Sequence, residues 1–453
     1  MNNSLTRALT TILEQPISDD DRVRASAHLL DWLGCAAIGS RSEQAATVRE
    51  YLTDYAATSP RPALALGLGP MAWGDALGYN AALGNVAEMD DLHRQSVLHP
   101  GPVVVPAALA CAQLLGASPV QLLDAIVRGY EVAIRIGRAL GTDHYALFHN
   151  TSTCGSFGAA AAAASLLGLN PDQQVWALGN AGTRTGGLWQ LRHESTMSKQ
   201  LHTAEAARSG VQAALLAAKG FTGPSQILEG PQGFFAAMSP AAQPEAVVAD
   251  EDRWLMYACS FKPWPACRHT HSAIDVARLC RREITDLSAV ESISLDTYSD
   301  ALTFCDRPEP ATENEAKFSL QHSIAVALLH DEPQLEHFYP HYLTDPVVSA
   351  LRARVNVALA ADIDSAYREH WGARLTITLT NGDVIRHHCK DALGDPECPL
   401  TPAQLADKAQ LLLAAGGMDE EPAKALIQAT LALPLAADLE NFNHCFGVAL
   451  EQS

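Results

Sequence analysis

Two changes in hydrophobic pattern divide this chain of 453 residues into three stretches. From about residue 5 to residue 253, Ala and Leu dominate and apolar residues recur at spacings of three and four, which is the period of an amphipathic helix. Pro and Gly interrupt the pattern and mark the ends of individual helices. The first stretch is therefore predicted to be helical, and its strongest segments are 22–38, 103–115, 120–140, 155–167 and 204–219.

Beyond residue 256 the pattern becomes typical of strands. Short segments rich in β-branched residues, bounded by turn residues, occur at 292–298, 374–380 and 383–389. Asn381 and Gly382, between the last two segments, form a favoured hairpin turn. Helical patterns at 272–282 and 315–329 lie among these strands, which predicts an α+β domain.

The helical pattern returns after Pro399, where Thr401 is a plausible N-cap. The segments concerned are 402–415, 421–431 and 439–452. This last stretch is expected to rejoin the first one. The predicted fold class is thus mostly α with a smaller α+β domain: a large all-helical domain of residues 1–255 and 395–453, and an inserted lid domain of residues 256–394. Ligand clefts commonly lie at such domain interfaces.

Charge and composition exclude several classes of protein. Because 31 Lys and Arg face 51 Asp and Glu, the net charge of −20 disfavours nucleic acid and anionic membrane as partners. No apolar stretch approaches the roughly 20 residues of a membrane span, and residues 1–10 lack the apolar core of a secretory signal. We therefore expect a soluble, cytoplasmic protein. Its 10 Cys residues show no Cys-x-x-Cys spacing, which predicts reduced thiols.

The first polar cluster contains Glu88, Asp90, Asp91, His93 and His99. Carboxylates can orient imidazoles and change their pKa, which acid–base catalysis requires. The alternative is an ordinary helix N-terminus, where acidic residues and a Pro-Gly loop precede an apolar helix without any catalytic role.

The second cluster contains Tyr145 and His149, followed by small and hydroxyl residues at 150–155. Free N–H groups at a helix start bind carboxylates, and His149 can exchange a proton beside them. Plain Ser/Thr capping of a buried helix is the alternative.

A third cluster, Met197, Lys199 and His202, opens the next long helix. A lysine that points inward can bind a carboxylate, or act as a base once burial lowers its pKa. A solvated surface lysine is the alternative.

The fourth cluster lies where the pattern changes. Two prolines make a stiff extended link that presents Lys262 and Arg268 at fixed positions, as an anion clamp requires. Cys267, His269 and His271 offer metal-ligand atoms, but no second ligand cluster has the expected spacing. A reactive thiol at Cys267 beside Arg268 is a further alternative. Since dinucleotide, P-loop, serine-elbow and His-Glu-x-x-His motifs are also missing from the sequence, we expect no cofactor and no metal.

In this order the four clusters resemble blocks of the MmgE/PrpD family, which includes 2-methylcitrate dehydratase, cis-aconitate decarboxylase and iminodisuccinate epimerase. The resemblance extends from about residue 88 to 320 and includes Lys219-Gly220-Phe221-Thr222-Gly223-Pro224 and Glu315-Ala316-Lys317-Phe318-Ser319. It implies a large helical domain with a smaller lid domain, a homodimer, and an active site between the domains. The pocket residues of the decarboxylase branch match Glu88 (Asp there), His99, His149, Lys199 and Lys262.

Three positions depart from the decarboxylase pattern. Leu92 replaces a threonine, Cys267 a histidine and Phe304 a tyrosine. These changes argue against cis-aconitate as the specific substrate. Tyr145, well placed before His149, would suit an epimerase that needs bases on both faces of its substrate.

The resulting hypothesis is proton abstraction next to a carboxylate of a small polycarboxylate. Cations hold the carboxylates and stabilise the enolate, while imidazole or phenol groups move the proton. The assigned catalytic groups are His99, His149, Lys199 and Tyr145, and the assigned substrate-binding residues are Glu88, Asp90, Asp91, Met197, His202, Lys262, Cys267 and Arg268. A lyase is favoured, an epimerase or isomerase is the alternative, and a non-catalytic acid-binding protein is the third possibility.

Overall fold

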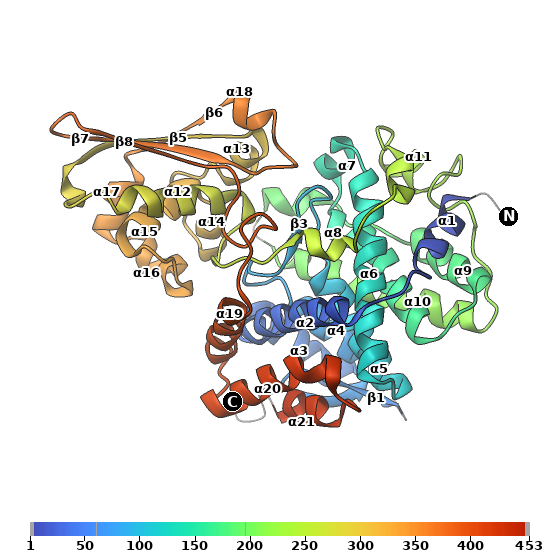
Figure 1. Ribbon diagram of the computed structural model, residues 1–453. Coiled ribbons are helices and arrows are strands. Elements are labelled where there is room, and N and C mark those ends of the chain that lie inside the picture. The colour runs from blue at the N-terminus through green and yellow to red at the C-terminus, as the bar shows by residue number, and fades with distance from the viewer. Residues whose placement is uncertain (1–3, 60, 195, 449–453) are drawn as a thin grey trace. The chain divides into compact units, whose positions relative to one another are not determined.

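The computed structural model describes residues 4–59, 61–194 and 196–448. Its chain forms two compact units, of which the larger comprises Met1–Val86, Asp90–Cys259 and Thr401–Ser453. The smaller unit comprises Ala87–Met89 and Ser260–Leu400, coloured mostly yellow to orange in Figure 1. The predicted fold class, mostly α with a smaller α+β part, is confirmed. The predicted domain limits at 255/256 and 394/395 stay a prediction, because a compact unit is not by itself a domain that folds alone.

The larger unit consists mainly of helices. They are α1 (Leu5–Ile12), α2 (Asp19–Gly39), α3 (Glu43–Tyr55), α4 (Trp73–Leu83), α5 (Gly101–Leu115), α6 (Pro119–Ala139), α7 (Thr142–Leu147), α8 (Asn150–Leu166), α9 (Pro171–Gly182), α10 (Ser198–Ala218), α11 (Phe234–Met238), α19 (Pro402–Ala415), α20 (Glu420–Ala432) and α21 (Glu440–Val448). The N-cap predicted at Thr401 is confirmed, since its hydroxyl accepts a hydrogen bond from Gln404 N–H at 3.2 Å. Residues 449–452 of the last predicted helix lie outside the described residues.

One short hairpin also belongs to the larger unit, where the sequence predicts only helices. Strands β1 (Pro62–Ala65) and β2 (Gly69–Ala72) pair antiparallel, with Ala65 opposite Gly69. Gly67 and Gly69 have φ of 75° and 74°, which suits a tight turn. Four residues per strand are too few for a period-two pattern to stand out in the sequence.

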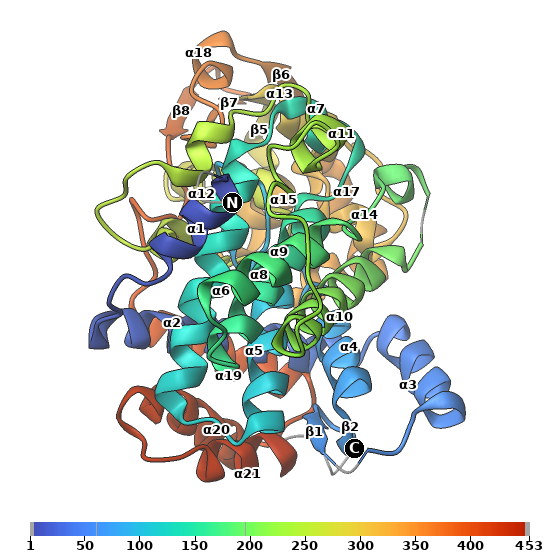
Figure 2. The ribbon, with the colours of Figure 1, turned by 90° about the vertical axis from the view of Figure 1, so that its right-hand side faces the viewer.

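Helix α8 is buried along almost its whole length and lies among α5, α6, α9 and α10 (Figure 2). Small residues allow these helices to approach closely. A Cβ added at Gly158 would lie 2.8 Å from Gly129 O, and one at Gly210 would lie 2.4 Å from Ser156 O. Because neither position has room for a side chain, the N-terminus of α8 is fixed by packing.

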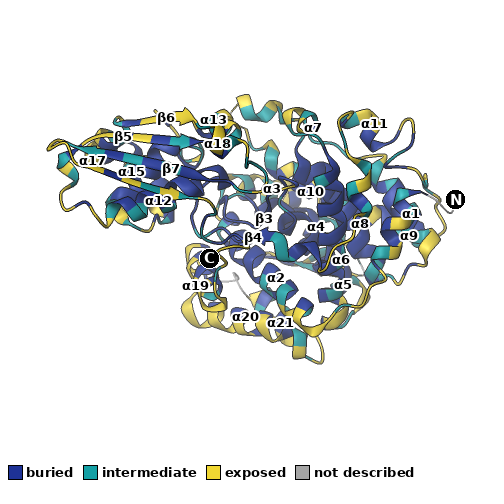
Figure 3. Cartoon of the chain, turned by 45° about the horizontal axis from the view of Figure 1, so that its top comes forward, coloured by how far each residue is buried: buried dark blue, intermediate teal, exposed yellow. Residues whose placement is uncertain are grey.

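The burial of residues differs between the helices of the larger unit. Figure 3 shows mostly buried residues along α4, whereas α20 and α21 carry many exposed residues. No helix in the described part of the chain combines the length and apolar character needed to cross a membrane.

The smaller unit contains a four-stranded sheet in the order β6-β5-β7-β8. Strands β5 (Val290–Thr297), β7 (Ala373–Leu379) and β8 (Val384–Cys389) confirm the three predicted strands and pair antiparallel. Strand β6 (Val355–Leu359), parallel to β5, was missed because it is a half-exposed edge strand without strict alternation. The predicted turn is confirmed at Gly382, whose φ is 90°.

Helices cover this sheet and connect its strands. They are α12 (His271–Arg281), α13 (Ser299–Cys305), α14 (Glu313–Lys317), α15 (Leu320–His330), α16 (Pro340–Leu343), α17 (Pro346–Arg352) and α18 (Ala361–Asp364). The single helix predicted at 315–329 is wrong, because α14 and α15 are separate. Ser319 is extended between them, and its hydroxyl caps α15 by accepting His322 N–H at 3.0 Å.

Candidate active site

The loop before α5 has a strained backbone around the paired aspartates. Glu88 and Val97 have φ of 59° and 46°, in the left-handed region that a β-branched residue such as Val rarely adopts. His93 and Leu98 form an isolated antiparallel bridge that closes the loop. Strain of this kind persists only where the surroundings fix the backbone, and it is common at functional sites.

Asp90 and His99 form a buried carboxylate–imidazole pair. His99 Nδ1 lies 2.8 Å from Asp90 Oδ2 and 2.9 Å from the Asp91 carbonyl oxygen. The Asp90 side chain is 1% exposed and the His99 side chain 14%. Because both neighbours of Nδ1 are oxygen acceptors, Nδ1 carries the proton in the neutral ring. Nε2 then keeps its lone pair and can act as a base.

The Asp91 carboxylate faces away from His99 and is hydrogen-bonded to three groups of the larger unit. Its carboxylate accepts hydrogen bonds from His28 Nδ1 at 2.6 Å, Tyr130 hydroxyl at 2.7 Å and Gly101 N–H at 3.0 Å. Burial raises the pKa of Asp91, but the hydrogen bonds and charge of His28, together with Tyr130 and Gly101, bring the pKa below its usual value. These contacts are those of an inner support of the loop, and the substrate-binding role predicted for Asp91 stays a prediction.

His149, just before α8, belongs to a second imidazole pair. Its Nδ1 lies 3.1 Å from His202 Nδ1 on α10, and its ring centroid lies 4.3 Å from that of Trp189 in the short helix η1 (Trp189–His193). Burial, and then the positive charge of Lys199, hold the pKa of His149 well below its usual value. His149 is therefore neutral near pH 7 and can give or accept a proton.

The two pairs are close to each other within the larger unit. Thr151, in the first turn of α8, accepts the backbone N–H of His99 at 3.0 Å. The charges of Lys199, His99 and Asp90 all influence the pKa of His149. Three of the four clusters predicted from sequence thus come together around the N-terminus of α8.

Two further predicted residues lie at the margin of this cluster. The Tyr145 ring contacts the Trp189 ring edge-on, with centroids 6.0 Å apart. Met197 Sδ lies 4.0 Å from Thr47 Oγ1 on α3. Trp189, which contacts both His149 and Tyr145, was not predicted. The available signal was a lone aromatic residue after a Gly-Gly pair.

In the smaller unit, Lys262 and Glu88 form a buried pair. Lys262 Nζ donates to Glu88 O at 3.0 Å and lies 3.7 Å from Glu88 Oε2. Burial raises the pKa of the nearby Cys267 thiol, but a hydrogen bond with Cys305 and the charge of Lys262 bring it below its usual value. Lys262, Glu88 and Cys267 therefore form one polar group in this unit.

Arg268 has a different environment. Its guanidinium pairs with the buried Asp395, which also accepts Ser260 hydroxyl at 2.5 Å and Ala392 N–H at 3.0 Å. The charge of Arg268 is thus compensated within the fold, and its predicted role as a substrate ligand stays a prediction.

A cluster of potential cation ligands lies elsewhere in the smaller unit. His370, Asp391 and Glu397 place potential ligand atoms within 4.8 Å of one another. His370 Nδ1 is, however, hydrogen-bonded to Asp391 Oδ1 at 2.7 Å. Asp391 and Glu397 lie in one segment after β8, whereas His370 lies before β7, so the sequence does not show that the three side chains meet.

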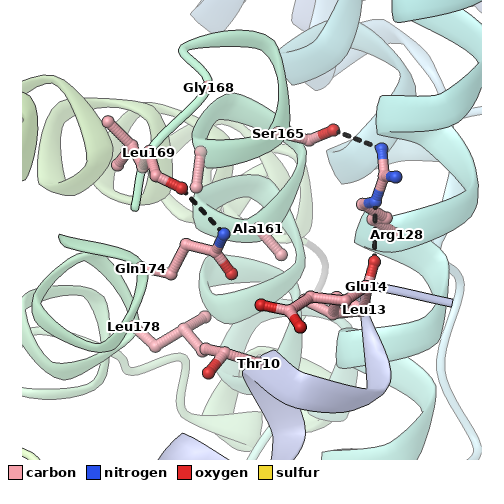
Figure 4. A pocket seen from close by; sticks show the side chains of 11 residues that line it. Thr10, Leu13, Glu14, Arg128, Ala161, Ser165, Gly168, Leu169, Gln174 and Leu178 are labelled. Atoms are coloured by element: carbon pink, nitrogen blue, oxygen red, sulfur yellow. Dashed lines mark hydrogen bonds between the residues drawn. The ribbon is translucent and has the colours of Figure 1, made fainter. Parts of the chain in front are cut away.

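A cavity of about 220 Å³ lies in the larger unit, away from these clusters (Figure 4). Its lining comes from α1, α6, α8 and α9 and comprises Thr10, Leu13, Glu14, Arg128, Ala161, Ala164, Ser165, Gly168, Leu169, Gln174 and Leu178. The cavity is at the C-terminal end of α8, about 24 Å along the helix from His149 at about 1.5 Å per residue. None of the predicted site residues lines it.

Comparison with known proteins agrees with the sequence resemblance. A cis-aconitate decarboxylase-like protein of Aspergillus oryzae is 27% identical over 95% of this chain and 94% of its own length. The cis-aconitate decarboxylase of Aspergillus terreus is 25% identical over 93% of this chain and 91% of its own. The human cis-aconitate decarboxylase is 27% identical over 86% and 83%, respectively.

The family profiles cover both halves of the chain. The MmgE/PrpD N-terminal domain matches residues 4–247, and the MmgE/PrpD C-terminal domain matches residues 264–434. The chain therefore belongs to the MmgE/PrpD family.

Proposed function

We propose that this protein is a cofactor-independent lyase of the dehydratase or decarboxylase type. Its substrate is a small polycarboxylate such as a citrate- or aconitate-like acid, and the first step removes a proton next to a carboxylate. The observation that carries the proposal is the buried Asp90–His99 pair beside neutral His149 and Lys199. The names of three relatives, all cis-aconitate decarboxylases or decarboxylase-like, support the same reaction type.

His99 is the proposed base. Its Nε2 takes the substrate proton, and the Asp90 carboxylate, 2.8 Å from Nδ1, stabilises the imidazolium that forms. The same carboxylate keeps the ring in the tautomer that leaves Nε2 free. This division of labour needs only the two side chains and their fixed geometry.

Lys199 and His149 have the complementary roles. Proton removal builds negative charge on the substrate carboxylate, and a positive Lys199 stabilises that enolate. In a dehydration, neutral His149 orients the leaving hydroxyl by a hydrogen bond and the proton that His99 took passes to it, so that water departs and His99 returns to its neutral form. In a decarboxylation, the proton that His99 took is returned to another carbon of the substrate. The bond to the departing carboxylate then breaks with its electron pair left on the substrate carbon, and a proton from water, relayed by His149, replaces the carbon dioxide. For Lys262, which the resemblance assigns to the substrate pocket, the role of carboxylate ligand stays a prediction.

The substrate need not be cis-aconitate itself. Phe304 stands where the decarboxylase branch has a tyrosine, and its ring stacks on His269 with centroids 5.1 Å apart. A phenyl ring fills that place without offering a hydroxyl to the substrate. The departure supports a related acid as substrate.

An epimerase or isomerase is the alternative. Tyr145 contacts the Trp189 ring that also covers His149, so a second proton-transfer group is near the first. If the proton returns to the other face of the enolate, the product is an epimer. A non-catalytic acid-binding protein is the third possibility. For each of these functions we propose that the protein is a homodimer, which light scattering can test.

Proton NMR in deuterated water distinguishes these functions. The enzyme is incubated with citrate, 2-methylcitrate, cis-aconitate and an amino-dicarboxylate. Dehydration produces new vinyl signals and decarboxylation removes carbon as carbon dioxide, and either result supports the lyase. Deuterium uptake with no change of skeleton supports the epimerase. Binding seen by calorimetry without turnover on any acid would contradict both enzymatic proposals.

A further inference from the structure

The loop that carries Trp189 is attached to the backbone around His149. The His149 N–H donates to Gly187 O at 2.9 Å, and Phe148 forms an isolated antiparallel bridge with Leu188. Both contacts involve the backbone directly before Trp189, the first residue of η1. The position of Trp189 relative to His149 is therefore set by the backbone.

Gly187 allows this close approach. Its φ is 126°, and a Cβ at this position would lie 2.8 Å from Ser152 Cβ and 3.4 Å from His202 Nδ1. The Thr185 hydroxyl also donates to Thr153 O at 2.6 Å. Because a side chain at position 187 would displace the loop from α8 and α10, the glycine keeps the loop against the start of α8.

The indole ring of Trp189 packs on the imidazole of His149. Their ring centroids are 4.3 Å apart, and the ring planes differ by 34°. The Tyr145 ring contacts the indole edge-on, and the Arg192 guanidinium carbon lies 5.5 Å from the indole centroid. No described residue accepts a hydrogen bond from the buried Trp189 Nε1. Ring packing, and not a hydrogen bond of the indole N–H, therefore fixes the Trp189 side chain.

His202 restrains the same imidazole through a hydrogen bond. His149 Nδ1 lies 3.1 Å from His202 Nδ1, so one of the two nitrogens donates and the other accepts. A hydrogen bond at one ring nitrogen still lets the ring tilt, whereas a contact on the ring face prevents the tilt. The two contacts together fix the direction of His149 Nε2. The charged and titratable groups whose charges act on His149 are Lys199, His202, His99 and Asp90.

We propose that Trp189 is a positioning residue for His149. Its ring face keeps His149 Nε2 directed at the substrate group on which it acts, and it covers the imidazole against water. This inference rests on the proposed function, in which neutral His149 orients or protonates that group. It adds to the site a residue from outside the four sequence clusters.

Two substitutions separate the ring face from the rest of the side chain. Trp189→Leu removes the aromatic face, so kcat should fall about 10- to 100-fold, as expected for a misplaced catalytic group, while KM changes by less than about threefold. Trp189→Phe keeps a flat ring on His149 and should stay within about threefold of the wild type in kcat. Wild-type kcat in Trp189→Leu, or a kcat in Trp189→Phe as low as in Trp189→Leu, would overturn the proposal.

A matched control separates positioning from folding. Trp176 on α9 is also half-buried and belongs to the larger unit. Trp176→Leu should lower the unfolding temperature and leave kcat unchanged. An equal loss of kcat in this control means that the effect is general destabilisation, and the proposal fails.

NMR of the histidines needs no substrate and keeps the two proposals apart. In protein labelled with ¹⁵N-histidine, the His149 signals are assigned by difference with His149→Gln. Trp189→Leu admits water to the imidazole, so the pKa of His149 should rise towards the ordinary value of about 6.5, and its signals should titrate at a higher pH than in the wild type. Trp189→Phe should titrate as the wild type does. Identical titrations of Trp189→Leu and the wild type would refute the proposal.

Gly187→Ala is the second variant, in case Trp189→Leu does not fold. The added Cβ pushes the loop away from α8 while the indole is retained. The titration of His149 should again move to higher pH and kcat should fall, and no change in either would contradict the proposed role of Trp189. Silence in every turnover assay with these spectral changes intact would count against the proposed function alone.

Discussion

Replacing Asp90 by Asn removes the negative charge next to His99, the proposed base, while it keeps the size of the Asp90 side chain. At the 2.8 Å between His99 Nδ1 and Asp90 Oδ2, an imidazolium gains about 6 kcal/mol from a carboxylate at an effective dielectric of ~20, and about 1.5 kcal/mol at ~80. The buried aspartate and the partly exposed histidine place the pair between these limits. Since about 1.4 kcal/mol is a factor of ten, turnover should fall by roughly 10²- to 10³-fold.

The assay is kcat and KM on the substrate identified by NMR, measured across pH. Because the lost interaction forms only when His99 becomes protonated, kcat should fall while KM changes little. Asp172→Asn, which alters an exposed carboxylate paired with Arg7 at the surface, serves as the control and should be neutral. Activity of Asp90→Asn within about threefold of the wild type, with the protein folded, would refute His99 as a carboxylate-supported base.

Three further predictions concern the same support and the smaller unit. Tyr130→Phe removes one of the hydrogen bonds to Asp91 and so raises the pKa of that carboxyl; we expect a loss of about 1.5–3 kcal/mol in the free energy of unfolding, and no loss would mean that the bond is dispensable. Gly101→Ala places a Cβ 2.8 Å from Asp91 Oδ1 and should lower the free energy of unfolding by about 1–3 kcal/mol. Gly116→Ala is the control: it has open space but a φ of 63°, so it tests backbone strain alone. Burial lowers the pKa of His322 to about 4, below the 6.5 of an unfolded histidine, so its contribution to stability is complete above pH 6.5 and is lost as pH falls towards 4. Urea unfolding from pH 7 to pH 4 should show a slope that His322→Gln reduces, by up to roughly 3 kcal/mol in total; an unchanged slope assigns the acid sensitivity to other groups.

Local signals explain which parts of the fold could be predicted. Helices such as α2 and α19 begin at Ser18 and Thr401, whose side chains cap them, and their apolar spacing is visible in the sequence. The break at Ser319 was missed because the apolar pattern runs through it, while the backbone there is extended. Propensity and spacing report helical character but do not show where one helix ends and another begins.

The residues of the candidate site also fall into two groups, those that the sequence indicates and those that only the folded structure brings together. Asp90, His99, His149 and Lys199 lie in short runs of polar residues, so the sequence itself draws attention to them. His28 and Tyr130 lie within helices and not in such polar runs, and they are far from the other site residues in sequence. A polar residue on an otherwise buried helix face needs a partner, but the identity of that partner is tertiary information.

The adjacency of Asp90 and Asp91 has a physical reason. The carboxylate of Asp90 faces His99, whereas the carboxylate of the next residue, Asp91, faces His28 and Tyr130. The Asp91 carboxylate anchors the loop to α2, α5 and α6. The backbone carbonyl oxygen of Asp91 accepts a hydrogen bond from His99 Nδ1 at 2.9 Å. The proposed role of Asp90 therefore depends on a backbone that the contacts of Asp91 hold in place. The same contacts compensate the backbone strain at Val97. One aspartate could not both support the loop and pair with His99, whereas two adjacent aspartates can divide these two roles.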